Sequence, residues 1–203
     1  MHTKLTYLDY AALPEDGKRH ELIDGVLIEM SAPATQHQRI IRELGRQLAN
    51  ALKGSDFESF SAPFDIRLPK PGIPSERATT VVQPDLCVYC SPADSDDRGG
   101  RCAPDFAIEI LSPSSITHDG VRKLKIYEEH GFKEYWIVDG DKRMVSVYRL
   151  DGQRFAPVES FAFDGVVPVQ SVPGLSLDFG QLAHELDHVQ MLKVNWRDSS
   201  VRL

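Results

Sequence analysis

Residues 106–111, FAIEIL, place a glutamate in the middle of an apolar, strand-forming run. On a strand, Glu109 shares one face with Ala107, while Ile108 and Ile110 point to the other face. An ionised carboxylate buried alone costs several kcal/mol, so Glu109 needs a basic partner or a metal ion. The segment therefore predicts a charge-balanced site built on a strand.

A second acid, Asp85, follows a proline inside the strand-like segment VVQPDLCVY, residues 81–89. Because Pro84 cannot donate a ladder hydrogen bond, it predicts an edge or a bulge, and bulges often redirect side chains beside active sites. Two acids on neighbouring strands can converge on one cation, and such oxygen ligands suit Mg²⁺ or Mn²⁺. The alternative is that Asp85 is a turn or cap residue.

A lysine on the next helix, predicted over residues 119–130, can supply the partner for Glu109. Lys123 lies one turn before Tyr127, on the flank of the inward face, whereas Lys125 lies further round and should be solvated. A flanking lysine can run its stem along apolar surface and deliver its ammonium to the sheet. Lys123 is therefore the predicted partner, although a buried Glu–Lys pair without any chemistry explains the same residues.

The elements around these residues follow from local signals. Asp24-Gly25 lies between two apolar runs and predicts a hairpin. Thr35 and Gln38 form a capping box that predicts the start of a long helix, and Gly54 is a plausible stop.

The order of elements predicts the sheet. FAIEIL, the helix and EYWIVD (residues 134–139) are long enough for a right-handed parallel crossover. Residues 144–150, MVSVYRL, form a predicted hairpin partner for EYWIVD. The chain is therefore predicted to be α/β, with a mixed sheet flanked by helices and with added β-hairpins.

Length and charge limit the classes of protein. The 203 residues suffice for one domain, and no apolar stretch approaches the roughly 20 residues that span a bilayer. The N-terminal sequence lacks the pattern of a signal peptide, so we expect a cytoplasmic protein that does not bind membranes. A formal charge of −7 disfavours nonspecific coating of nucleic acid but allows an enzyme with a local basic surface.

Two further motifs do not support other chemistries. Cys87 and Cys90 lie three apart on a strand, so they point to opposite faces and are predicted to be packing residues rather than zinc ligands. The SPSS segment, residues 112–115, lacks the G-x-S-x-G elbow of a serine nucleophile. A loop that leads into the helix is the favoured interpretation.

Several motifs occur together in the order of a known family. These are HELIDGVLIEMSAPATQHQ, PDLCV, PDFAIEILSPSS, KLKIYEEHGFKEYWIVD and VPGLSLDF. With them the chain resembles the Uma-type family of predicted endonucleases, within the PD-(D/E)XK nuclease superfamily. The resemblance extends to about Leu186. It implies a single restriction-endonuclease-like domain over residues 1–186, followed by a C-terminal tail over residues 187–203.

The resemblance also assigns roles. Asp85 and Glu109 match the motif acids and, with the backbone carbonyl of Ile110, would hold the metal. The superfamily places a lysine two residues after the glutamate, where this chain has Leu111. The Uma-type family carries its lysine on the next helix, in a Lys-x-x-x-Tyr context that Lys123 fits. This lysine would orient water or neutralise charge on the phosphate.

Other positions have weaker assignments. The resemblance makes Glu21 an extra metal or water ligand and makes His37 an aid to proton transfer. Glu21 could instead pair with a basic residue, and His37 could be a hydrogen-bonded core residue. Arg39, Arg42 and Arg46 form one helical stripe that could contact DNA phosphates, or it could be a solvated face.

The predicted function is hydrolysis of DNA phosphodiester bonds by a metal-dependent endonuclease with Mg²⁺ or Mn²⁺. The resemblance implies a homodimer, because restriction-like enzymes often pair to cut two strands. The alternative is a catalytically weak or inactive nuclease-fold protein that binds nucleic acid or a protein partner. The Asp–Glu–Lys set favours the enzyme, and the net acidity favours the binding module.

Overall fold

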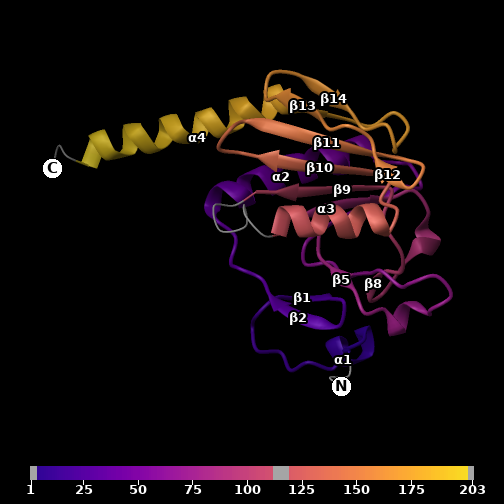
Figure 1. Cartoon of the computed structure of the whole chain (residues 1–203). Coiled ribbons are helices and arrows are strands. Elements are labelled where there is room, and N and C mark those ends of the chain that lie inside the picture. Colours follow the sequence, from indigo (N-terminus) through magenta and orange to yellow (C-terminus); the bar gives the residue numbers. More distant parts are fainter. Residues whose placement is uncertain (1–3, 112–118, 201–203) are drawn as a thin grey trace.

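The centre of the fold is a seven-stranded mixed sheet with helices on both faces (Figure 1). The computed structural model describes residues 4–111 and 119–200. The strand order is β12-β11-β10-β9-β6-β3, and β13 also pairs with β11. The strands of this sheet are β3 (Glu58–Ser61), β6 (Leu86–Tyr89), β9 (Phe106–Ile110), β10 (Glu134–Asp139), β11 (Met144–Asp151), β12 (Arg154–Phe155) and β13 (Glu159–Ala162).

A second sheet of six short strands lies below the first in the view of Figure 1. Its order is β2-β1-β5-β4-β8-β7. Its strands are β1 (His20–Ile23), β2 (Val26–Glu29), β4 (Ile66–Arg67), β5 (Val81–Val82), β7 (Ser95–Asp96) and β8 (Gly99–Gly100). A separate antiparallel pair is formed by β14 (Val166–Pro168) and β15 (Ser176–Asp178).

Four α-helices complete the described part of the chain. They are α1 (Tyr7–Ala11), α2 (Thr35–Ala51), α3 (Asp119–Glu129) and α4 (Phe179–Ser200), with short 3₁₀ helices η1 (Ser75–Arg77) and η2 (Pro92–Asp94). The end of α4 extends away from the sheets (Figure 1). The predicted boundary between residues 186 and 187 lies inside α4, so the division into a domain and a tail stays a prediction.

The predicted parallel pairing across the helix is confirmed. Strands β9 and β10 are parallel neighbours, with Glu109 opposite Ile137, and α3 connects them. Strand β11 then pairs antiparallel with β10, as the predicted hairpin requires. The turn of the predicted β1–β2 hairpin has positive φ at both Asp24 (52°) and Gly25 (80°), which is the geometry that favours this dipeptide.

Two sequence predictions about local structure are wrong. The segment VVQPDLCVY is not one strand, because it breaks at Gln83–Asp85 into β5 and β6, which belong to different sheets. Pro84 thus ends a strand rather than bulging one. The predicted capping box at Thr35 is also absent, since Ala34 is the N-cap of α2 and makes no side-chain cap bond.

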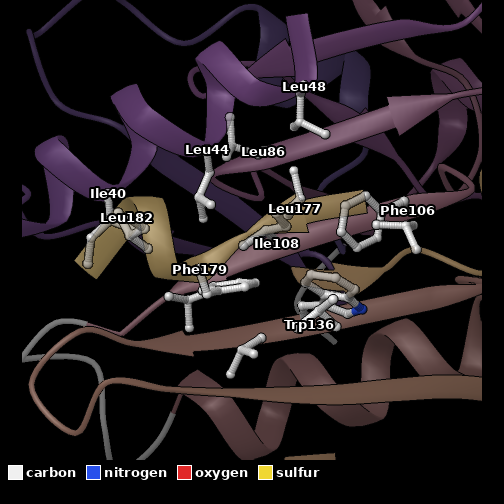
Figure 2. Packing of buried hydrophobic residues seen from close by; sticks show 14 of the residues in the cluster. Ile40, Leu44, Leu48, Leu86, Phe106, Ile108, Trp136, Leu177, Phe179 and Leu182 are labelled. Atoms are coloured by element: carbon white, nitrogen blue, oxygen red, sulfur yellow. The ribbon is translucent and has the colours of Figure 1, made fainter. Parts of the chain in front are cut away.

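Apolar side chains from the two faces of the large sheet form two separate cores. In the larger one, Phe106 and Trp136 pack edge to face with ring centroids 5.0 Å apart, and Phe179 of α4 lies 5.9 Å from Trp136 (Figure 2). Leucines of α2 cover the same face (Figure 2). Strand β9 alternates as predicted, because Ile108 belongs to this core and Ala107 to the other.

The second core lies under α3 and includes residues from both sheets. Cys87 belongs to it, whereas Cys90 packs against the first core, in agreement with the predicted opposite orientation of these cysteines. Glu109 lies on the same face of β9 as this second core. The fold therefore brings a carboxylate of the central sheet to the junction with the small sheet.

Candidate active site

One pocket of about 110 Å³ collects the predicted catalytic residues. It lies where the small sheet meets β9, α2 and α3. Its lining includes Glu21, His37, Asp85, Glu109, Ile110 and Lys123. These residues come from five places in the chain that are far apart in sequence, so the tertiary fold assembles them.

Lys123 binds two carboxylates at once. Its Nζ lies 2.8 Å from Oε1 of Glu109 and 2.9 Å from Oε1 of Glu21. The predicted pairing of Lys123 with Glu109 is confirmed. Lys125 is exposed, as predicted, and faces Glu129 on the surface of the same helix. Burial lowers the pKa of Lys123, but the two carboxylates outweigh this effect and hold the pKa above its ordinary value.

Glu109 has a second donor from the same helix. The hydroxyl of Tyr127 donates to Oε1 of Glu109 at 2.7 Å, so both donors contact one oxygen. The pKa of Glu109 is raised to about 7, because burial and the neighbouring Asp85 and Glu21, which raise it, outweigh Lys123, which lowers it. The acid on β9 therefore gains or loses its proton near neutral pH.

The ring of Tyr127 is held rigidly. It stacks on Phe132 with centroids 4.1 Å apart and meets Tyr135 edge to face at 4.8 Å. The side chain is fully buried. The spacing of four residues from Lys123 places both donors on one side of α3, which is the signal that the sequence carried for Tyr127.

Asp85 lies in the break between β5 and β6, and its carboxylate points across to β9. Its Oδ2 accepts from the backbone amide of Ile110 at 2.8 Å and lies 3.0 Å from Nε2 of His37. Its own carbonyl accepts from the amide of Ala62. The contact with His37 links the start of α2 to the site. Nδ1 of His37 is buried and makes no hydrogen bond with the described residues.

Glu21 is part of this arrangement as an ion-pair partner. Its Oε1 accepts from the backbone amide of Gln83 at 2.8 Å as well as from Lys123. The prediction that Glu21 pairs with a basic residue is therefore confirmed. Its role as a metal or water ligand stays a prediction.

The carboxylates suit a small oxygen-binding cation. The hydrogen bonds described above use Oδ2 of Asp85 and Oε1 of Glu109, and among the side chains that the structure describes none donates to Oδ1 or Oε2. Across those same residues, no group of three or more His, Cys, Asp or Glu side chains is arranged to hold a metal. Mg²⁺ usually takes one or two carboxylates and keeps several waters, so Asp85 and Glu109 fit that ion without a third protein acid.

Sequence reasoning missed Arg19, Gln83 and Arg122. Arg19 and Arg122 line the pocket, and the side chain of Gln83 accepts two hydrogen bonds from Arg19. Arg19 and Gln83 are 64 residues apart. No local pattern signals such a contact, because it depends on how β1 and β5 pair.

The predicted DNA-binding arginines of α2 lie outside this pocket. Arg46 is exposed and pairs at 2.7 Å with Glu43, which is buried, so the face is only partly solvated. Arg42 is exposed, and Arg39 lines a separate cavity of about 300 Å³ beside the β10–β11 turn. Contact of these residues with DNA stays a prediction.

The fold is that of a nuclease-like α/β protein. A crystal structure described as "a putative nuclease belonging to DUF820", from Anabaena variabilis ATCC 29413, is similar, with a TM-score of 0.68 and 25% identity. The alignment covers 90% of this chain and 99% of that one. The predicted restriction-endonuclease-like fold class is therefore confirmed.

The family follows from the sequence match. The model of the Uma2 family, described as "Putative restriction endonuclease", matches residues 7–180. This chain belongs to the Uma2 family, and the predicted Uma-type resemblance is confirmed. The descriptions of this family and of the similar solved structure both name nucleases.

The description of one curated relative names no activity. "Uncharacterized protein slr1290" of Synechocystis sp. is 25% identical over 132 residues. The match covers 64% of this chain and 66% of that protein, just under two thirds of its length.

Among the helices of the described residues, none has the length and apolar character needed to cross a membrane.

Proposed function

We propose that this protein is a metal-dependent endonuclease that hydrolyses phosphodiester bonds of DNA, with Mg²⁺ or Mn²⁺ as cofactor. The observation that carries the proposal is the meeting of Asp85, Glu109 and Lys123 at one pocket. Family membership and the similarity to a solved structure described as a nuclease support the same reaction class. DNA as the substrate rests on the family description.

Each residue has a chemical role in this proposal. Asp85 and Glu109 would hold the cation, together with the backbone carbonyl of Ile110. A divalent metal would activate water as a nucleophile and polarise a phosphate oxygen. Lys123 places a positive charge beside the reacting phosphate, and such preorganised charge stabilises a transition state in which negative charge develops.

Three neighbouring side chains hold these groups in place. His37 contacts the carboxylate of Asp85 from α2, at 3.0 Å, and lines the pocket, where its imidazole would assist proton transfer. Glu21 accepts from the ammonium of Lys123 and holds it within the site. Tyr127 fixes one oxygen of Glu109, which leaves the other oxygen for the cation.

The size of the pocket supports a polymeric substrate. Pockets that enclose a whole small molecule usually measure about 300–1,000 Å³. A volume of about 110 Å³ admits a group of the size of a phosphate, while the rest of the substrate stays outside. A nucleic-acid backbone meets this requirement.

A second candidate function is that of a catalytically weak or inactive nuclease-fold protein that binds nucleic acid or a protein partner. Two observations favour it. Lys123 already neutralises two carboxylates of the site, which reduces the need for a metal ion. The formal charge of −7 also favours this candidate over an active DNA endonuclease, because net negative charge opposes strong binding to DNA.

The test is a nicking assay on supercoiled DNA with Mg²⁺ or Mn²⁺. Asp85→Asn preserves shape but removes a negative ligand, so it should abolish nicking and weaken metal binding while the protein stays folded. Asp151→Asn, at an exposed end of β11, is the matched control and should nick like the wild type. Equal nicking by all three proteins would identify a contaminating nuclease, and absence of nicking by the wild type on any DNA form would favour the binding module.

The proposal includes a homodimer that brings two such sites to the two strands. Light scattering coupled to gel filtration distinguishes a dimer from a monomer of 22.7 kDa. A monomer at concentrations that support cleavage of both strands would contradict this part of the proposal.

A further inference from the structure

The side chain of Gln83 connects the pocket to the N-terminal segment through several hydrogen bonds. Its Oε1 accepts from Nε and Nη2 of Arg19 at 3.0 and 2.8 Å. Its Nε2 donates to Oδ1 of Asp65 at 2.8 Å and to the hydroxyl of Tyr10 at 3.2 Å. Gln83 is itself buried. Its side-chain amide is held by three neighbouring groups, which are Arg19, Asp65 and Tyr10.

The same residue also holds part of the proposed catalytic site. The backbone amide of Gln83 donates to Glu21, and Gln83 comes two residues before Asp85. Gln83 therefore fixes the position of Arg19 relative to the carboxylates, although it does not itself line the pocket. A residue that orients another in this way is a positioning residue.

The charge of Arg19 remains available to a ligand. Arginine usually pairs with a carboxylate when it is held by two parallel bonds, and that pairing neutralises its charge. Here the acceptor is a neutral amide, and Nη1 makes no hydrogen bond within the described part of the chain. The nearby acid Glu29 is engaged with Lys18 at 2.7 Å.

Asp65 belongs to this network but does not pair with Arg19. Asp65 accepts from Gln83 and from the hydroxyl of Tyr10, at 2.8 and 3.0 Å, and it makes no ion pair with Arg19 among the described residues. Arg19 lines the pocket with Glu21 and Lys123. A guanidinium with a free edge beside a phosphate-sized pocket is suited to a second phosphate oxygen or to the adjacent phosphate.

We infer that Arg19 binds a backbone phosphate of the substrate next to the reacting one, and that Gln83 is its positioning residue. The inference rests on the proposed function for the identity of the substrate. Arg19 supplies affinity and register along the strand, whereas the carboxylates and Lys123 act on the reacting phosphate. Phosphate contacts of this kind position a nucleic acid without reading its sequence.

The test measures binding separately from cleavage. The full chain is titrated against a fluorescently labelled DNA duplex, and against the single strand, in EDTA at several salt concentrations. Arg19→Gln should weaken binding about tenfold at moderate salt and should lower the slope of log Kd against log salt by about 1. Arg154→Gln, an exposed arginine on the edge strand β12, is the control and should change neither.

The role of Gln83 is tested by Gln83→Met, which keeps the shape of the side chain and leaves the backbone bond to Glu21. Like Arg19→Gln, it should weaken binding of DNA. Asp65 loses its bond from Gln83 but keeps the one from Tyr10. The double variant Arg19→Gln/Gln83→Met should bind no more weakly than Arg19→Gln alone, because both changes remove one interaction. Melting curves identify any loss of folded protein.

The outcomes separate this inference from the proposed function. An unchanged slope for Arg19→Gln, additive losses in the double variant, or no DNA binding by the wild type would overturn the inference. A wild type that binds with the expected pattern but never cleaves would refute the nuclease proposal and leave the role of Arg19 intact. Cleavage by the wild type that is unaffected by Arg19→Gln at limiting DNA would also overturn the inference.

Discussion

Replacement of Lys123 by methionine tests the electrostatics of the site. Lys123→Met keeps the length and apolar stem of the side chain but removes the ammonium between Glu109 and Glu21. Both carboxylates then lose a partner in a poorly solvated place. Removing one member of a buried ion pair typically costs about 3–5 kcal/mol of the free energy of unfolding.

The loss in free energy of unfolding depends on pH, because Glu109 titrates. Its pKa is about 7 in the folded protein against an ordinary value of 4.5, so the folded state binds more protons than the unfolded state between these values. Stability from this group is therefore highest below about pH 4.5 and falls as the pH rises toward 7, by about 3 kcal/mol in total. Without Lys123, which lowers the pKa, this cost should increase and extend to higher pH.

The assay is urea unfolding at pH 8 and pH 5. Lys123→Met should lose about 3 kcal/mol relative to the wild type at pH 8, and the loss should be smaller at pH 5 by more than about 1 kcal/mol, because a protonated Glu109 needs no counter-charge. Lys125→Met, on the exposed face of the same helix, should lose less than about 0.5 kcal/mol at either pH. Equal stability of the two variants, or a loss that does not depend on pH, would refute the reasoning.

Two further predictions concern the same carboxylate. Binding of Mg²⁺ near pH 7 should release protons, because Glu109 must be ionised to act as a ligand; calorimetry in buffers of different ionisation enthalpy measures the number, and a value of zero would contradict a shared site with Asp85. Tyr127→Phe should cost about 1.5–3 kcal/mol, because it removes a hydrogen bond to a carboxylate while the ring packing stays; unfolding at pH 8 measures this loss, and an unchanged midpoint would show that the hydroxyl adds nothing.

Local features of the sequence determined much of the scaffold. The Asp24-Gly25 turn, the β9–α3–β10 crossover and the face of Glu109 all follow from backbone preference or from the period of apolar residues, and the structure has each of them. The choice of Lys123 over Lys125 followed from helical spacing. Such features are predictable because the residues that decide them are neighbours along the chain.

The tertiary structure alone decided how these pieces meet. The sequence signalled a perturbation at Pro84, but not that β5 and β6 would enter different sheets and leave Asp85 in the gap between them. The bonds from Arg19 to Gln83 and from the amide of Ile110 to Asp85 join residues 64 and 25 positions apart. Their formation depends on strand pairing and on the burial of apolar faces, and no short segment of the chain specifies either of these by itself.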